Sequence, residues 1–311
     1  MLPLMRVFSG IAITVAAAMM PATVALAQDF GDTPYVQTPM SVVERMLQMA
    51  HVGPRDYVID LGSGDGRLVI TAAKKYGAHG FGVDLDRRLV DLANRGAARA
   101  GVRDRAVFYE RDIYETDLSS ATVVTTYLLP EVNLMLRPTL LSTLKPGTRL
   151  VTHDYDMGEW QPDEQTVLDV PDKPVGRDKR SKVFFWVVPG NAAGRWRWEL
   201  PLAGKPAVWE MTIAQNFQKI SGSVSIDDRT LALLNPRLSG EDIAFELADG
   251  STRYAFSGHI TLHDLAGSVQ VTAPTAQSRL GWDAARVELG TPAHLLLKRP
   301  TMQELQEKMQ P

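Results

Sequence analysis

The sequence predicts an α/β protein with a doubly wound, Rossmann-like sheet, followed by a mostly β domain that forms a sandwich or a barrel. Between residues 57 and 153, short apolar strands alternate with helical stretches, which is typical of a parallel sheet covered by helices. After Pro189 the period of apolar residues changes to two, beginning with Trp196 and Trp198. Short alternating strands separated by turn residues indicate antiparallel pairing. We expect the aromatic side chains there to form a core.

The first predicted strand runs into a glycine-rich turn. Residues 57–70 read YVIDLGSGDGRLVI, so a buried strand ends near an acid and a helix follows the turn. Glycine permits left-handed backbone and close approach of a ligand, and the amides at the start of the helix attract it. The turn therefore predicts a nucleotide-binding crevice. Its predicted ligand-binding residues are Asp60, Gly62, Ser63, Gly64 and Gly66.

The spacing and charge of the turn indicate which nucleotide binds. Dinucleotide enzymes prefer G-x-G-x-x-G, whereas this turn reads G-x-G-x-G and carries acids at Asp60 and Asp65. Carboxylates disfavour a pyrophosphate and favour a cationic ligand. S-adenosylmethionine, a sulfonium without phosphate, is the cofactor that we expect. The alternatives are a nicotinamide cofactor, which the spacing disfavours, and a glycine turn with a structural role only.

Two further acids follow predicted strands. Residues 80–83 form a strand that ends at Asp84, which is placed to bind the ribose hydroxyls, with Asp86 as the neighbouring option. A helix over residues 87–100 follows, and a third strand, residues 106–110, leads to Asp112, which suits the adenine amino group. Leu85 and Ile113, directly after Asp84 and Asp112, complete the predicted cofactor site.

The remaining elements place the acceptor side of the site. A helix is predicted to start here, with Thr38 as N-cap and Pro39 at the first helical position. Either this helix lies over the crevice with residues 35–37 as a lid, or it covers the sheet, or both hold. The other predictions are a fourth strand (121–128), a helix (131–144), a fifth strand (149–152) and a closing antiparallel hairpin (164–170 and 182–188). Residues that follow the fourth and fifth strands should face the substrate. We expect the catalytic residues to be Tyr127, Asp154 and Glu131.

Residues 35–160 resemble the class I, seven-strand S-adenosylmethionine-dependent methyltransferases, and most closely the ATP synthase c-subunit lysine methyltransferase family. The resemblance rests on TPYVQTPMSVVERML, DLGSGDGRLVI, GVDLDRRLV, RDIYETDLS and YLLPEVN. It implies methyl transfer to a lysine ε-amine of a protein, with a membrane protein as one option. Tyr127 would then flank the lysine stem, and Asp154 or Glu131 would orient the ammonium before it loses its proton. The chain departs from the family in its long C-terminal extension and its N-terminus.

The N-terminus predicts export. Arg6 is the one charge before an apolar run over residues 7–20, and small residues precede Gln28, which is the layout of a cleaved signal peptide. An uncleaved membrane anchor, a mistaken start codon and a buried helix are the alternatives. We therefore expect a signal peptide (1–27), a methyltransferase domain (28–189), a β-rich domain (190–298) and a tail (299–311). An exported, periplasmic or membrane-associated location conflicts with the cytosolic supply of S-adenosylmethionine.

Composition limits the other function classes. The chain of 311 residues has a net charge of −3, so attraction to nucleic acid is not expected. It has no cysteine and six scattered histidines, which disfavours a metal site and excludes a thiol nucleophile. The remaining alternative to an enzyme is an exported binding module that keeps a methyltransferase fold without turnover.

Overall fold

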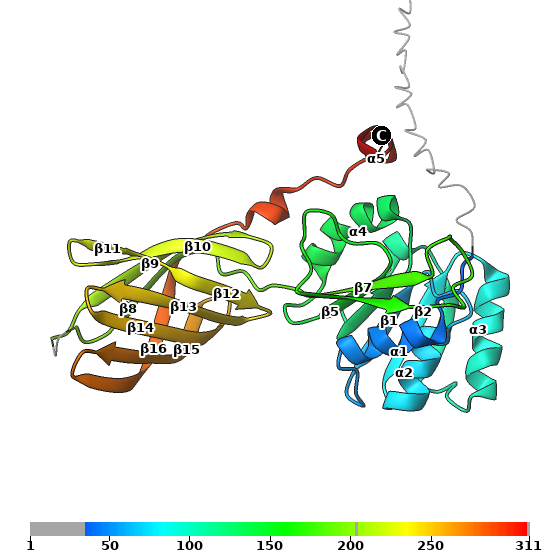
Figure 1. Cartoon of the computed structure of the whole chain (residues 1–311), viewed down its shortest axis with the longest axis horizontal. Coiled ribbons are helices and arrows are strands. Elements are labelled where there is room, and N and C mark those ends of the chain that lie inside the picture. Colours follow the sequence, from blue (N-terminus) through cyan, green and yellow to red (C-terminus); the bar gives the residue numbers. More distant parts are fainter. Residues whose placement is uncertain (1–34, 203–204, 310–311) are drawn as a thin grey trace, which may run out of the picture. The chain divides into compact units, whose positions relative to one another are not determined.

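The computed structural model describes residues 35–202 and 205–309 (Figure 1). The predicted signal peptide lies outside these residues. The first part of the described chain is a seven-stranded sheet in the order β3-β2-β1-β4-β5-β7-β6. Its strands are β1 (Tyr57–Leu61), β2 (His79–Asp84), β3 (Ala106–Glu110), β4 (Val123–Thr126), β5 (Arg149–His153), β6 (Glu164–Asp169) and β7 (Arg180–Val187).

Five of these strands are parallel, and the last two close the sheet as the predicted hairpin. β7 runs antiparallel to β5, with His153 opposite Val183, and β6 pairs with β7 at the edge. The doubly wound sheet with a closing hairpin is thus confirmed. The strand order reverses between β1 and β4, and ligands of such sheets bind at the carboxyl ends of the strands beside that reversal.

Helices cover both faces of the sheet because its central strands are apolar on both faces. They are α1 (Met40–Met49), α2 (Arg67–Tyr76), α3 (Arg87–Arg99) and α4 (Pro130–Thr143). Val58 and Val123 pack with α1 and α2, whereas the next residues, Ile59 and Val124, pack with α4. This alternation follows from the period of two along a strand. Figure 1 shows α4 on one side of the sheet and α1, α2 and α3 on the other.

The start of α1 differs from the prediction. The N-cap is Pro39 rather than Thr38, and the helix begins at Met40 without a side-chain cap. The Thr38 hydroxyl instead lies 3.3 Å from Nδ1 of His153, and its carbonyl accepts a hydrogen bond from Arg67 at 2.6 Å. Thr38 therefore connects the helix start to the carboxyl edge of the sheet, which local sequence rules do not reveal.

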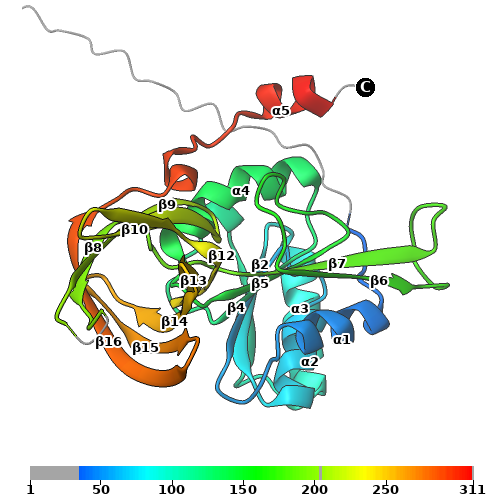
Figure 2. The same cartoon turned by 60° about the vertical axis from the view of Figure 1, so that its left-hand side comes forward.

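The second part of the described chain is one antiparallel sheet of nine strands, which curls into a nearly closed barrel (Figure 2). Its order is β11-β10-β9-β8-β16-β15-β14-β13-β12. The strands are β8 (Gly194–Glu199), β9 (Val208–Asn216), β10 (Lys219–Ile226), β11 (Arg229–Ala232), β12 (Leu234–Ser239), β13 (Asp242–Asp249), β14 (Thr252–Ile260), β15 (Asp264–Ala273) and β16 (Ala276–Leu289).

The interior of the curled sheet is filled by aromatic and aliphatic side chains. Alternate residues of β9 are buried, from Trp209 to Gln215, as the period of two predicted. Trp198, Trp282 and Phe256 pack with ring centroids 4.8 to 5.9 Å apart and edge-to-face geometry. These aromatic residues are core, as expected. After the sheet come a short 3-10 helix, η2 (Ala293–Leu296), and α5 (Met302–Met309). No helix in residues 35–202 or 205–309 is long and apolar enough to span a membrane.

Candidate active site

The glycine turn lies at the carboxyl end of β1, directly beside the reversal of strand order. Gly64 and Gly66 have φ of +53° and +79°, a region that other residues rarely adopt. The amides of Gly62 and Ser63 donate to the carbonyl of Val83 at 3.0 and 2.9 Å, which fixes the turn against β2. The Ser63 hydroxyl is buried and has no hydrogen-bond partner among the described residues. The turn is therefore built to present backbone and one hydroxyl to a ligand.

Asp60 is a buried carboxyl at the base of this turn. Its side chain accepts a hydrogen bond of 2.6 Å from the Thr125 hydroxyl on β4. Burial raises the pKa of Asp60 to about 7, although the Thr125 hydrogen bond opposes the shift, and the nearby charges of Asp84 and Asp65 add to it. Removal of water from a carboxylate disfavours its ionised form. A cation placed beside Asp60 would restore that form, so the site suits a positively charged ligand.

Asp84 ends β2 and faces the glycine turn. One carboxylate oxygen accepts a hydrogen bond of 2.9 Å from the amide of Gly64, and the other accepts one of 3.0 Å from the amide of Asp86. Asp86 instead caps α3, accepting from the amide of Arg88 at 2.8 Å. The structure thus places Asp84 at the crevice and gives Asp86 a helix-capping contact. Leu85, beside it, is 69% exposed.

Asp112 follows β3, which is the strand next to β2. Its carboxylate accepts a hydrogen bond of 2.8 Å from the amide of Tyr114 and so caps the short 3-10 helix η1 (Ile113–Glu115). Ile113 is half-buried against the core beneath α4. The strand order brings Asp60, Asp84 and Asp112 to one edge of the sheet, at the ends of β1, β2 and β3. The predicted role of Asp112 at the adenine amino group stays a prediction.

Asp65 does not add an unbalanced negative charge to the turn. Its carboxylate forms hydrogen bonds of 2.9 and 2.6 Å with the guanidinium of Arg67. Burial favours the neutral acid, but the hydrogen bonds and charge of Arg67 outweigh it, so the pKa of Asp65 lies below its usual value. Asp65 is therefore not one of the free acids that the sequence predicts, because its carboxylate is paired with the guanidinium of Arg67.

The segment before α1 lies against the glycine turn. The Tyr35 ring is so close to Gly64 that a Cβ at Gly64 would overlap it, and the Gln37 amide donates to the Tyr35 hydroxyl at 3.1 Å. The helix α1 itself packs through Val43 and Leu47 on the sheet and α2. The helix therefore covers the sheet, as one expectation had it, and the segment before it contacts the turn. The role of that segment as a lid stays a prediction.

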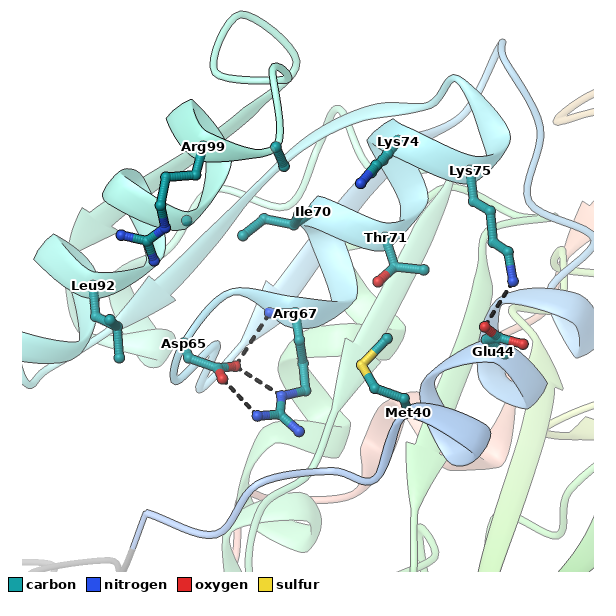
Figure 3. Close-up of a pocket in the computed structure, with 12 residues that line it drawn as sticks. Met40, Glu44, Asp65, Arg67, Ile70, Thr71, Lys74, Lys75, Leu92 and Arg99 are labelled. Atoms are coloured by element: carbon teal, nitrogen blue, oxygen red, sulfur yellow. Dashed lines mark hydrogen bonds and ion pairs between the residues drawn. The ribbon is translucent and has the colours of Figure 1, made fainter.

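A cavity of about 730 Å³ lies beside this segment but outside the cofactor crevice. It is lined by α1, α2 and α3, and of the acids predicted around the turn it includes Asp65 but not Asp60, Asp84 or Asp112. Figure 3 shows that Asp65 and Arg67 pair at one end and Lys75 and Glu44 at the other. These two ion pairs neutralise part of the charged lining. The three acids predicted to bind the cofactor lie outside this cavity, at the strand ends.

The acceptor side is formed by residues that follow β4 and β5. The ring centroids of Tyr127 and His153 lie 3.9 Å apart. The ring of Tyr155 is stacked with that of Tyr127 at a centroid distance of 6.4 Å. Burial, reinforced by the charge of Asp154, raises the pKa of the Tyr127 hydroxyl, so this residue stays a neutral phenol. Burial lowers the pKa of His153 to about 4, so its imidazole is neutral at ordinary pH. A neutral aromatic wall beside a carboxylate is suited to a lysine side chain.

Asp154 is held at several points. Its backbone has φ of +61°, and its carboxylate accepts from the amide of Lys182 at 3.0 Å and pairs with the ammonium of Lys173 at 2.8 Å. Tyr127 and Asp154 are neighbours in the structure, and their catalytic roles stay predictions. Glu131 lies half-buried in the first turn of α4, and no hydrogen bond or ion pair joins it to this cluster among the described residues.

Sequence reasoning missed several residues of this cluster. Ser181 lies 3.0 Å from Nε2 of His153, and Asn133 donates to the carbonyl of Tyr155 at 3.2 Å. Lys173 comes from the loop between β6 and β7, which looked like an ordinary charged loop. The antiparallel return of β7 brings Ser181 and Lys173 to the site, and Asn133 comes from the first turn of α4. Tertiary contacts between separate elements form this cluster, so no local spacing could have identified it. In the described part of the chain, no group of His, Asp and Glu side chains is arranged to hold a metal ion.

Comparison with known proteins identifies the family. The ANTKMT methyltransferase domain matches residues 60–164. A protein-lysine N-methyltransferase of Saccharolobus islandicus is 45% identical over 140 residues, which cover 45% of this chain and 86% of that protein. The chain belongs to the protein-lysine N-methyltransferase family. Within the region of similarity lie the glycine turn, the three strand-end acids, Tyr127 and Asp154.

Other relatives share a smaller part of their length. The adenine nucleotide translocase lysine N-methyltransferase of Mus musculus is 33% identical over 129 residues, and the match covers 42% of this chain and 56% of that protein. The chain thus spans little more than half of that relative. An RNA methyltransferase of Salinibacter ruber, solved with S-adenosyl-L-homocysteine, is 47% identical with a TM-score of 0.46, covering 49% of this chain and 94% of that one.

The cofactor of this protein-lysine methyltransferase is S-adenosylmethionine, as the sequence predicted. The residues of the crevice fit it: Asp60 is a buried carboxyl suited to a cation, and the Ser63 hydroxyl is buried without a partner. Asp84 and Asp112 lie at the strand ends where an adenosine would be held. When bound, the cofactor supplies an electrophilic methyl group. The chain's own part is to position the amine and exclude water. Family membership leaves the nicotinamide and binding-module alternatives without support.

Proposed function

We propose that this protein-lysine methyltransferase receives its acceptor lysine between Tyr127 and Asp154, and that its substrate is a protein of the cell envelope. The observation that carries the first part is the pairing of a neutral aromatic ring with a carboxylate at the carboxyl ends of β4 and β5. The rings of Tyr127 and His153 lie 3.9 Å apart, next to Asp154. An acceptor ammonium would be oriented by the carboxylate, and its alkyl stem would contact the ring.

The chemistry of the step supports this arrangement. A lysine must be a neutral amine to attack the methyl carbon, so its ammonium first releases a proton to water. Asp154 would hold the ammonium in place before that release, and Tyr127, kept as a phenol, brings no competing charge. Orientation of the lone pair toward the methyl group is then the main contribution of the protein.

Variants of these two residues test the assignment. Asp154→Asn should lower kcat for a lysine-containing protein substrate by about 10- to 100-fold, the cost of one lost charge-assisted contact, and leave the affinity for S-adenosylhomocysteine unchanged. Tyr127→Ala should raise KM more than Tyr127→Phe does. The matched control is Asp172→Asn, an exposed carboxylate in the same loop as Lys173. Equal activity of Asp154→Asn and Asp172→Asn would reject the role of Asp154.

The envelope location rests on the N-terminal sequence, because residues 1–27 carry the pattern of a signal peptide. A membrane protein is the acceptor class that fits an enzyme delivered there. Fractionation of cells with determination of the mature N-terminal residue should give a chain that begins at or near Gln28 outside the cytosol. Recovery of the intact chain in the cytosol would reject this location.

The acceptor itself is found by labelling. An extract from a strain that lacks the gene is incubated with the purified enzyme and methyl-labelled S-adenosylmethionine. Label should appear in a protein band of the membrane fraction, and amino-acid analysis should recover it as methyl-lysine. Label that remains in lipids or small molecules would reject a protein acceptor, and label confined to soluble proteins would reject a membrane acceptor.

A further inference from the structure

Lys173 faces inward from a stretch of loop whose other residues, from 171 to 179, are exposed. The loop joins β6 to β7, and its residues 171–179 are all exposed except Lys173, whose side chain is 11% exposed. The ammonium lies 2.8 Å from the Asp154 carboxylate and donates a hydrogen bond of 2.6 Å to the carbonyl of Arg180. A long, flexible cation buried in this way loses side-chain entropy, so the contact must be specific.

The loop lies at the edge of the sheet where methyl transfer takes place. β7 runs antiparallel to β5, with His153 opposite Val183, so the start of β7 and the loop before it lie at the carboxyl end of β5. Tyr127 follows β4 at the same edge, and its ring lies against His153. Tyr127 and the Lys173 ammonium therefore have one neighbour in common, the carboxylate of Asp154.

We propose that Lys173 is a methyl acceptor of this enzyme in cis, so that the protein methylates its own β6–β7 loop. The inference rests on the proposed function, since it places the chain's own lysine on the carboxylate that we assign to the substrate lysine. It adds a modification site, and it implies that this loop must leave Asp154 before a lysine of another protein can enter.

The transfer is an ordinary displacement. The Lys173 ammonium releases one proton to water, and its lone pair attacks the methyl carbon of S-adenosylmethionine. The new N–C bond forms as the S–C bond breaks, and the sulfur keeps the bonding pair, which gives S-adenosylhomocysteine. The product amine takes up a proton and remains a cation, so it can still pair with Asp154.

The full-length protein is tested with S-adenosylmethionine that carries a deuterated methyl group, followed by peptide mass spectrometry. We expect the label on the peptide that contains Lys173, with a first-order rate that does not change when the protein is diluted, as an intramolecular step requires. Lys173→Arg should lose this label, although the arginine still places a cation beside the Asp154 carboxylate. Lys179→Arg is the matched control, because Lys179 is exposed in the same loop and donates to the carbonyl of Lys173 at 2.6 Å.

The possible results separate this inference from the proposed function. Label on another protein's lysine but none on Lys173 would overturn the inference and leave the proposed function intact. Label on Lys173 at a rate proportional to protein concentration would overturn the step in cis. Binding of S-adenosylhomocysteine without label on any lysine would reject the proposed function itself. An unlabelled Lys179→Arg variant would also count against Lys173, since that change leaves the acceptor amine in place.

Discussion

The backbone amide of Gly64 donates a hydrogen bond of 2.9 Å to the carboxylate of Asp84, twenty residues further along the chain. This contact joins the glycine turn after β1 to the end of β2. It fixes the carboxylate whose predicted partner is the ribose of S-adenosylmethionine. The orientation of the acid that is predicted to bind the cofactor is thus set by the amide of a glycine in the predicted binding turn.

Asp84→Asn is expected to weaken binding of S-adenosylhomocysteine by about 10- to 100-fold, since a hydrogen bond to a charged group contributes about 1.5–3 kcal/mol. Calorimetric titration measures the change directly. Asp86→Asn is the matched control, because Asp86 caps α3 through the amide of Arg88 rather than facing the turn. An equal loss of affinity in both variants would mean that Asp84 acts through folding of this region and not through the ligand.

Cofactor binding should release a proton from Asp60. Burial raises the pKa of Asp60 to about 7, so the free enzyme holds this carboxyl largely protonated below that pH. A sulfonium and an α-amine beside it favour the carboxylate, so the bound form has a lower pKa and the affinity should rise with pH up to about 7. Calorimetry at about pH 6 in buffers of different ionisation enthalpy counts the released proton.

Variants of Asp60 and of its hydrogen-bond partner Thr125 identify the source of that proton. Asp60→Asn should abolish the release. Thr125→Val removes the hydrogen bond that opposes the shift, so it should raise the pKa of Asp60 further and extend the release to higher pH. Wild-type protein that binds with no proton release at any pH between 5 and 7 would contradict the prediction.

Gly66 is predicted to tolerate no side chain. Its φ is +79°, and an added Cβ would overlap the Phe108 ring and lie 2.8 Å from Cβ of Ala93. Gly66→Ala should lower the free energy of unfolding by about 2–5 kcal/mol, the sum of left-handed strain and overpacking. Gly101 has φ of +71° with no atom within 4 Å of an added Cβ, so Gly101→Ala isolates the backbone cost of about 1–2 kcal/mol. Equal urea midpoints for the two variants would refute the clash.

The sequence predicted those parts of the site that depend on a strand and the residues directly after it. Asp60 and Asp84 lie at the carboxyl ends of β1 and β2, and Asp112 follows β3. Parallel strands bring such positions to one edge of the sheet. The pairing of Asp154 with Lys173 was not predictable in this way. It depends on the hairpin of β6 and β7, whose register and loop conformation are set by tertiary contacts rather than by local pattern.

The same distinction between local pattern and tertiary pairing applies to the strands of the second sheet. β9 has strict alternation of buried and exposed residues and was recognised. β12 contains Pro236, shows no such alternation, and has a register shift between Leu234 and Arg237. Its pairing with β13 is formed by the backbone, whose hydrogen-bonding capacity is not visible in the side-chain pattern.

His153 should make the protein sensitive to acid. Its imidazole lies between the hydroxyls of Thr38 and Ser181, and burial lowers its pKa from 6.5 to about 4. Between these values the unfolded chain binds a proton that the folded chain does not. The stabilising contribution of neutral His153 is therefore complete above pH 6.5 and is lost as the pH falls toward 4, with a total of up to about 3 kcal/mol.

Urea unfolding at several pH values between about 4 and 7 measures this slope. His153→Gln should reduce the slope even where it also lowers the absolute stability. Burial also lowers the pKa of His294 in η2 to about 4, and its Nδ1 accepts a hydrogen bond of 2.7 Å from the amide of Phe217. His294→Gln should therefore reduce the slope separately, and the double variant should combine both effects because the two imidazoles share no partner. If stability depends on pH equally in His153→Gln and the wild type, then His153 binds its proton as readily in the folded as in the unfolded chain, and the prediction is wrong.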